Sequence, residues 1–234
     1  KAFISGAGST DMLVVMARSG VAGAKGISAF AVPADLPGIR YGKKEDKMGW
    51  NSQPTRAIFF DDVRVPAANR LGEEGEGFRI AMKGLDGGRI NIATCSVGAA
   101  QGAFNAAQRY LGERQQFGKK LADFQALQFR LADMATELVA ARQMIRLAAS
   151  KLDAAAPDTS IYCAMAKRFA TDAGFNVCNE ALQLHGGYGY LRDYPLERLL
   201  RDSRVHQILE GTNEIMRVII ARRMLEADAP DSIR

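Results

Sequence analysis

The residues best suited to chemistry stand in one run near the C-terminal end, from Glu210 to Glu214. Glu210 comes just before a last helical segment, which the pattern predicts to end near residue 225. A carboxylate held at such a loop-to-helix junction is a candidate general base. Gly211 lets the backbone come close to a flat ligand, and the two residues after it can cap the helix. The plainer alternative is a surface glutamate before an ordinary capped helix.

A second candidate lies at Arg114, Phe117 and Gly118. These residues combine a permanent cation, an aromatic ring and a backbone without a side chain. Such a set can hold a pyrophosphate and the edge of an adenine. The alternative is a loop that ends a helix and carries a surface arginine.

A third candidate is the glycine-dense run from Gln183 to Tyr190, which ends a helical pattern. Its backbone can lie flush against a planar ligand. The commoner alternative is a helix C-cap followed by a turn, since Gly186 accepts the left-handed conformation there. His185 is then a core or helix-end histidine rather than an acid–base group.

The fourth candidate is Asp86-Gly87-Gly88-Arg89. This run can bind a ligand phosphate or orient a carboxylate. The alternative is a helix kink with a surface Asp–Arg pair, which contributes little to stability.

The composition limits which partners and which class of protein are expected. The chain has 234 residues, 47% hydrophobic and 24% charged, as in ordinary globular proteins with one large or two modest domains. A net charge of +5 favours anionic partners, but it is too small and too scattered to indicate nucleic acid. Three widely spaced cysteines and two histidines predict neither a disulfide framework nor a metal site. No apolar run approaches ~18 residues, so we expect no membrane span.

Residues 1–66 have the pattern of a β-domain. Short β-rich runs stand at Met12–Ala17, Ile27–Val32 and Ala57–Val63, separated by turn residues. Their spacing predicts what remains of an antiparallel sandwich or barrel. Because the chain begins in the middle of a strand-like pattern, we expect it to be a piece of a longer protein.

Residues 67–234 have the pattern of helices. We expect a helix from Gly75 towards Leu85, an interruption or bend at Asp86–Arg89, and a second helix over Ile90–Leu111. Residues 227–234 are expected to fray.

Further helices follow from apolar spacing. Apolar residues at steps of three and four from Phe124 to Leu152 predict one long helix. Later helices are predicted over Ile161–Leu184, Pro195–Asp202 and Thr212–Leu225. A two-stranded coiled coil is an alternative, but these flanking helices favour an antiparallel bundle.

Together these motifs resemble the flavin-dependent acyl-CoA dehydrogenases, and most of all their isobutyryl-CoA members of valine degradation. The matching motifs run from end to end: KAFISGAG at 1–8, GKKEDKMGWNSQPTR at 42–56, GLDGGRINIA at 84–93, RQQFGKKLADFQALQFRLADMAT at 114–136, ALQLHGGYGYLRDYP at 181–195 and RDSRVHQILEGTNEIMR at 201–217.

The resemblance implies an α+β fold that is mainly α. Residues 1–66 correspond to the C-terminal part of the middle β-domain, a remnant of an antiparallel β-domain. Residues 67–234 correspond to the C-terminal domain, an up-down four-helix bundle. The family's N-terminal helical domain is expected to be absent from this chain.

The resemblance also implies the activity, which is α,β-dehydrogenation of a short branched acyl-CoA to the 2-enoyl-CoA. Glu210 would remove the α-proton, and the β-hydrogen would pass as hydride to FAD. Some relatives carry the base at the position of Gly88, which here has no carboxylate. An acyl-CoA oxidase, or a truncated non-catalytic helical module that only oligomerises, are the alternatives.

Further site residues and partners follow from the resemblance alone. The residues implied for FAD are Phe3, Ile4, Ser5, Arg114, Phe117, Gln125, Gln183, His185, Gly186, Gly187, Thr212, Asn213 and Glu214. Those implied for the acyl-CoA are Asp86, Gly87, Gly88, Arg89 and Arg222. The implied partners are electron-transfer flavoprotein and further copies of the chain, in a dimer of dimers. The expected location is the cytoplasm of a bacterium or the mitochondrial matrix of a eukaryote.

Overall fold

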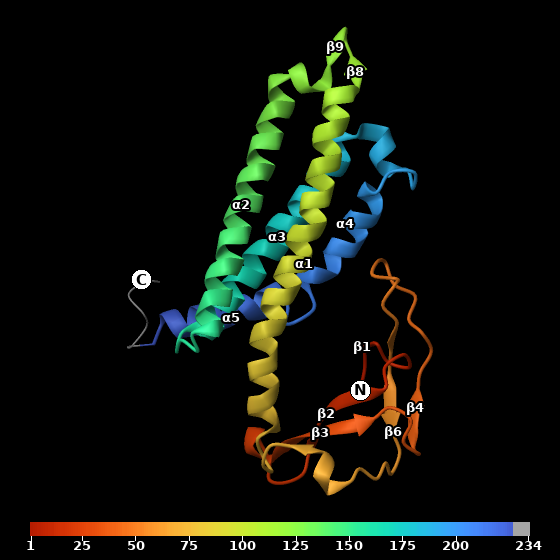
Figure 1. Cartoon of the computed structure of the whole chain (residues 1–234), viewed down its shortest axis with the longest axis vertical. Coiled ribbons are helices and arrows are strands. Elements are labelled where there is room, and N and C mark those ends of the chain that lie inside the picture. Colours follow the sequence, from red (N-terminus) through yellow and green to blue (C-terminus); the bar gives the residue numbers. More distant parts are fainter. Residues whose placement is uncertain (227–234) are drawn as a thin grey trace. The chain divides into compact units, whose positions relative to one another are not determined.

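The computed structural model describes residues 1–226 and divides the chain into two compact units, Lys1–Leu85 and the part from Asp86 onward (Figure 1). The expected fraying of residues 227–234 lies outside the described residues.

Antiparallel strand pairs make up the N-terminal unit. Strand β2 (Met12–Arg18) pairs along its whole length with β3 (Ile27–Pro33), and β7 (Arg70–Leu71) pairs with the other edge of β3. Two shorter pairs accompany them: β1 (Ile4–Ser5) with β5 (Thr55–Arg56), and β4 (Ile39–Tyr41) with β6 (Ile58–Phe60).

A small apolar core explains these pairings. Leu13 and Val32 are opposite one another in the register of β2 and β3, and both are buried together with Ala7 and Ile58. Cross-strand apolar pairs of this kind are the unit of sheet stabilisation. The antiparallel β-rich segment predicted from the sequence is confirmed, although β6 is shorter than the predicted run.

The expected break at Asp86–Arg89 is wrong. Helix α1 is continuous from Gly77 to Glu113 and passes through this run. Two glycines lower helix propensity by about 1 kcal/mol each, but glycine keeps the backbone N–H that proline lacks, so the hydrogen-bond ladder can continue. The Asp86 and Arg89 side chains, three residues apart, form an ion pair on one face of the helix.

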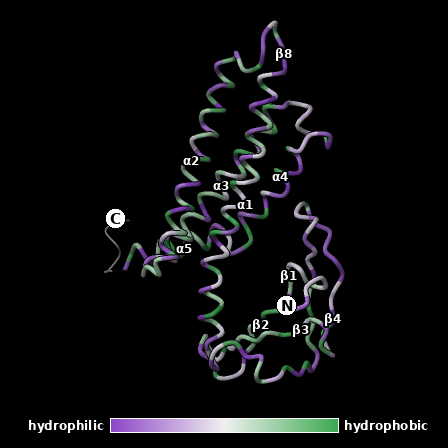
Figure 2. Tube along the Cα trace, in the orientation of Figure 1, coloured by the Kyte–Doolittle hydropathy of each residue, from purple (hydrophilic) through white to green (hydrophobic). Residues whose placement is uncertain are grey.

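The other predicted helices are present. A hairpin of β8 (Gln115–Gln116) and β9 (Lys119–Lys120) joins α1 to α2, and Figure 2 shows it as hydrophilic. The following helices are α2 (Gln125–Asp153), α3 (Thr159–Leu184), α4 (Leu196–Arg204) and α5 (Asn213–Met224).

One apolar core joins four of these helices. Ala103 of α1, Leu138 of α2, Val177 of α3 and Leu196 of α4 are buried in the same cluster. A bundle that shares one core is the architecture predicted from the sequence, and the two-stranded coiled coil is set aside. Among the described residues, no helix has the length and apolar character needed to cross a membrane.

Small residues allow α1 and α3 to approach closely. A Cβ atom added at Gly174 of α3 would lie 2.3 Å from the Ser96 hydroxyl oxygen and 3.1 Å from the Ser96 carbonyl oxygen. No methyl group fits at that separation, so the crossing depends on glycine.

We expect Gly174→Ala to lower the free energy of unfolding by about 1–3 kcal/mol, because the added methyl group overpacks the crossing. Denaturant unfolding of the purified protein measures the change. The matched control is Gly98→Ala, also within a helix, where an added Cβ meets no atom within 4 Å. It should be neutral or stabilising by up to about 1 kcal/mol. Equal effects from the two substitutions would contradict the packing argument.

Candidate active site

Glu210 lies in a tight turn between the 3-10 segment Val205–Gln207 and α5. Its backbone φ is +56°, and the φ of Gly211 is +91°. A left-handed conformation is uncommon for residues other than glycine and marks a position that its surroundings must enforce. The side chain is half-buried. Thr212 ends the turn as the N-cap of α5, since its hydroxyl accepts a 3.4 Å hydrogen bond from the Ile215 N–H.

The Glu210 carboxylate lies directly against α1 at Gly88. A Cβ atom added at Gly88 would be 2.5 Å from Glu210 Oε2 and 3.0 Å from its Cδ. Any side chain at position 88 would therefore collide with the carboxylate where it now stands. The structure thus brings together two positions far apart in sequence, a carboxylate and the gap in which it sits.

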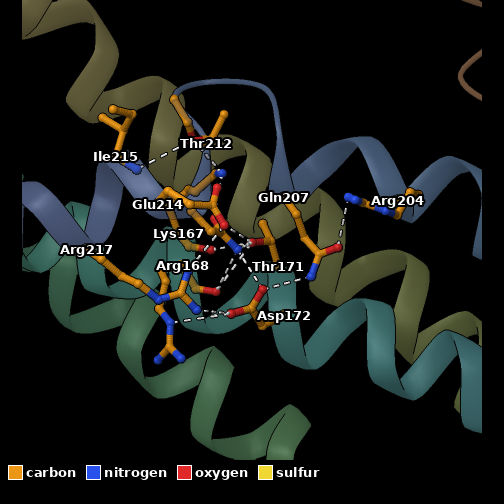
Figure 3. A network of polar contacts seen from close by, with 12 residues as sticks. Lys167, Arg168, Thr171, Asp172, Arg204, Gln207, Thr212, Glu214, Ile215 and Arg217 are labelled. Carbon is orange, nitrogen blue, oxygen red and sulfur yellow. Dashed lines mark hydrogen bonds and ion pairs between the residues drawn. The ribbon is translucent and has the colours of Figure 1, made fainter.

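A buried lysine of α3 holds the Glu210 turn and the start of α5 through two hydrogen bonds (Figure 3). Lys167 has no solvent exposure, and its ammonium group donates to the Gly211 carbonyl oxygen at 2.7 Å and to Asn213 Oδ1 at 2.8 Å. A buried charge costs free energy unless it is hydrogen-bonded. Here the acceptors belong to the turn, so the ammonium group and the turn stabilise one another.

A carboxylate five residues further along α3 belongs to the same network (Figure 3). Asp172 Oδ1 accepts from Asn213 Nδ2 at 2.7 Å and from Gln207 Nε2 at 2.8 Å. Its other oxygen faces Arg168 at 3.4 Å and Arg217 at 3.5 Å. The residues just before and just after the Glu210 turn are therefore tied to one side chain.

The Asp86–Arg89 pair belongs to a second polar cluster. Arg89 is buried and donates to Asp86 Oδ1 at 2.7 Å, and the Ser160 hydroxyl donates to Asp86 Oδ2 at 2.6 Å. Arg89 Nε has no hydrogen-bond partner among the described residues. Ser160 also lines a hollow of about 270 Å³ that contains Arg222. A buried guanidinium with a spare donor suits an anionic or carbonyl-bearing ligand, and so does an arginine that lines a hollow.

A separate hollow of about 580 Å³ lies near the hairpin end of the bundle. It brings together Arg114, Gln183, His185, Gly186 and Gly187 from two predicted motifs. Added Cβ atoms at either glycine would meet nothing within 4 Å, so the glycines leave an open cradle.

Aromatic rings form part of the wall of this hollow. The His185 ring stacks on Tyr110 at a centroid distance of 4.3 Å, and the Arg114 guanidinium lies 5.5 Å from the centre of the Tyr188 ring. Burial lowers the pKa of His185, so its ring is neutral near pH 7 and donates through Nδ1 to the Ala181 carbonyl oxygen at 2.8 Å. A cation beside aromatic faces and bare backbone suits a planar ring that carries an anion.

The remaining predicted site residues lie outside these two hollows. Phe117 is 90% exposed at the tip of the hairpin, and Gln125 is exposed at the start of α2. Phe3, Ile4 and Ser5 belong to the N-terminal unit, where β1 pairs with β5. Glu214 is exposed in the first turn of α5, where a carboxylate is favourable beside the helix N-terminus.

Sequence reasoning missed Lys167, Thr171 and Asp172. The available signal was Lys167 itself, which directly follows the apolar run 163–166 at a position facing the bundle interior. A long cationic side chain there must find acceptors, but the sequence does not say which ones.

The chain matches two family descriptions in order. Residues 1–63 match the middle domain of acyl-CoA dehydrogenases, and residues 75–225 match their C-terminal domain. The chain therefore belongs to the acyl-CoA dehydrogenase family. Members of this family are FAD-dependent oxidoreductases.

Among its relatives, the chain is 58% identical to the mitochondrial isobutyryl-CoA dehydrogenase of Bos taurus, over 97% of this chain and 54% of that protein. It thus spans about half the length of that relative. The butyryl-CoA dehydrogenase structure from Megasphaera elsdenii matches with a TM-score of 0.94 and 44% identity, over 97% of this chain and 59% of that one. A structure from work on the electron transferring flavoprotein of Acidaminococcus fermentans matches with a TM-score of 0.94 and 47% identity, over 97% and 60%.

Burial changes the titration of Lys167. It lowers the pKa of the ammonium group from its ordinary 10.5 to about 8, although nearby carboxylates oppose the shift. Between pH 8 and 10.5 the unfolded chain therefore binds more protons than the folded chain, so folding stability rises with pH in this window. The groups that act electrostatically on Lys167 are Asp172 of α3, Glu210 of the turn, Glu214 of α5 and Arg89 of α1. His206 of the 3-10 segment also faces it, but burial lowers the pKa of His206 to about 4, so that its ring is neutral in this pH range.

We predict that the rise in folding stability between pH 8 and 10.5 is lost in Lys167→Met. The free energy of unfolding of the unmodified protein, minus that of the variant, should increase by the order of 1–2 kcal/mol from pH 7.5 to 9.5. Denaturant titrations of both proteins at several pH values give the difference, in which other titrating groups cancel. A difference that stays constant over this range would contradict the depressed pKa.

Proposed function

We propose that this chain supplies the catalytic base and part of the ligand sites of a short branched-chain acyl-CoA dehydrogenase. The proposal is carried by one observation: the Glu210 carboxylate is held in a strained turn against a helix position that has no side chain. A surface glutamate before an ordinary helix cap needs neither feature. Family membership and the high identity to an isobutyryl-CoA dehydrogenase support the same reading.

In this proposal Glu210 removes the α-proton of an acyl-CoA thioester. The electron pair of the broken Cα–H bond forms the double bond as the β-hydrogen departs with its own pair. Bound FAD supplies the acceptor for that hydride. The proton remains on the Glu210 carboxylate, and the product is a 2-enoyl-CoA.

The turn also offers a way to stabilise charge on the thioester oxygen. In relatives the backbone N–H at the base is one donor to that oxygen, and a fixed donor of this kind is an oxyanion-type device. Here the backbone at Glu210 is held by the contacts of Gly211 and Asn213 to α3. A preorganised donor stabilises developing charge without reorganising during the reaction.

The two hollows fit the two ligands of such an enzyme. The cradle at Gly186 and Gly187, with Arg114 beside it, suits the diphosphate and adenosine of FAD. The spare Arg89 donor and the Arg222 hollow suit the acyl-CoA, which carries carbonyl and phosphate oxygens. Phe3, Ile4 and Ser5 are proposed to contact the flavin ring, as in the family.

Isobutyryl-CoA is the proposed substrate, on the strength of the bovine relative. Electron-transfer flavoprotein is the proposed electron acceptor, and the match to a structure from work on such a protein supports it. An acyl-CoA oxidase would use the same base but would consume oxygen and release peroxide. The proposed assembly is a dimer of dimers in which the FAD cradle serves the cofactor of a neighbouring copy.

Replacing Glu210 by Gln in the whole protein tests the base. The amide keeps the shape of the side chain but cannot accept the α-proton, so we expect the turnover number to fall by a factor of about 10³ or more. Dye-linked dehydrogenation of isobutyryl-CoA measures it, with flavin absorbance confirming that FAD stays bound. A near-normal rate would refute Glu210 as the base.

A second prediction concerns the gap at Gly88. A methyl group there would lie 2.5 Å from Glu210 Oε2 and displace the carboxylate, so Gly88→Ala should lower the turnover number by roughly 10- to 100-fold. Gly84→Ala is the matched control on the same helix, because an added Cβ at Gly84 meets nothing within 4 Å. Equal rates for the two variants would show that the position of the carboxylate against α1 does not matter for the reaction.

A further inference from the structure

We propose that Lys167 and Asp172 of α3 are positioning residues for the catalytic carboxylate. Lys167 binds Gly211 and Asn213, and Asp172 binds Gln207 and Asn213, so that together they hold the Glu210 turn. The inference rests on the proposed function, because it assumes that the position of Glu210 matters for proton removal. Neither residue touches the carboxylate through a hydrogen bond in the structure. Both act on the backbone and side chains that carry it.

The turn needs an external restraint. Two successive residues, Glu210 and Gly211, have positive φ, and only the second is glycine. A glutamate in the left-handed region is strained and relaxes unless neighbouring contacts hold it. Relaxation would move the carboxylate away from Gly88, against which it is now packed.

Lys167 supplies the restraint at the centre of the turn. Its ammonium group donates at 2.7 Å to the carbonyl oxygen of Gly211, the residue immediately after the base. The bond forms with Gly211 in its left-handed conformation, so it favours that conformation over others that would turn the carbonyl away. The second bond, 2.8 Å to Asn213 Oδ1, ties the start of α5 to the same ammonium group.

The Asn213 side chain is oriented by its other partners. Its amide nitrogen donates to Asp172 at 2.7 Å and to the Thr171 hydroxyl at 3.0 Å, and the residue is 3% exposed. Since the nitrogen is engaged with acceptors, the oxygen must face the lysine. Lys167 therefore binds the amide oxygen of Asn213 while Asp172 binds its amide nitrogen, and the side chain is held in one orientation.

Asp172 supplies the restraint at the entrance. The same oxygen that accepts from Asn213 also accepts from Gln207 at 2.8 Å. Gln207 precedes the turn and Asn213 follows it, so one carboxylate oxygen fixes the separation of the two ends. The arginines near its other oxygen, Arg168 and Arg217, help to keep Asp172 in place.

A purely structural role would not need a charge at this position. An apolar side chain of similar volume would fill the interior of the bundle without the cost of burying an ammonium group. The carbonyl oxygen of Gly211 and the oxygen of Asn213, in contrast, require a donor that reaches both. The lysine is the group that fits this requirement.

Lys167→Met in the FAD-loaded whole protein is the main test. The variant keeps the length of the side chain and removes its donors. We expect the turnover number to fall roughly 10- to 100-fold while KM changes less than about threefold, because ligand contacts stay and the base is misplaced. Amide hydrogen exchange of a peptide covering residues 208–213 should become at least about tenfold faster relative to peptides of α2.

Two further variants keep the test decisive. Gln207→Ala removes one tie to Asp172 at a half-buried position and should show the same pattern in weaker form. If Lys167→Met does not fold, Gln207→Ala decides. Arg142→Met is the matched control: its guanidinium group joins α2 to Gln101 of α1 at 2.8 Å, away from the turn, so both turnover and exchange at 208–213 should stay unchanged.

The outcomes separate the inference from the proposed function. If Glu210→Gln is inactive while Lys167→Met keeps normal turnover, the inference is overturned and the proposed base stands. Where Lys167→Met does not fold, normal turnover of Gln207→Ala has the same meaning. A loss of turnover with unchanged exchange at 208–213 also overturns it, since the turn would not have moved. If Glu210→Gln is active, the proposed function fails, and the exchange measurement alone then shows whether α3 holds the turn.

Discussion

The contact between the Glu210 carboxylate and α1 at Gly88 is the constraint on which the candidate site depends. Glu210 belongs to a turn tied to α3, whereas the gap belongs to α1. Their separation is therefore set by how closely these two helices approach. Gly174 and Ser96 set that approach, because no atom beyond hydrogen fits between them. The packing of Gly174 against Ser96 thus fixes the distance between the Glu210 carboxylate and Gly88.

Most of the fold follows from local pattern. The apolar spacing of α2 and α3, and the turn residues between β2 and β3, report directly on which face of an element is buried. The interruption expected within α1 is wrong because it rests only on the low helix propensity of two adjacent glycines. At Gly88 the reason for glycine is tertiary: the Glu210 carboxylate occupies the space a side chain would need. A local rule cannot distinguish a glycine that ends a helix from one that makes room for a neighbour.

The site could be predicted only in part. The sequence predicts Glu210 from its place before a capped helix, and it predicts both motifs that contribute to the hollow of about 580 Å³, one at Arg114 and one at 183–187, from their residue types. The contact between Glu210 and Gly88 was not predicted: the resemblance gave Gly88 only as a substrate-site residue and as the position where some relatives carry the base. Lys167 and Asp172 were missed because a buried polar residue on an otherwise apolar helix face has no meaning until its partners are known.

Several independent contacts restrain the backbone of Gly211, the glycine of the turn. Its φ of +91° already favours glycine, and an added Cβ would lie 2.7 Å from Met216 Cε, the side-chain end of a fully buried residue of α5. Its carbonyl oxygen is held by Lys167. Packing against α5 and a charged hydrogen bond from α3 thus act on one residue, so Glu210, covalently joined to it, inherits a fixed backbone. Rigid elements that converge on the residue beside a base can orient that base without touching it, and they leave its carboxylate free for a proton.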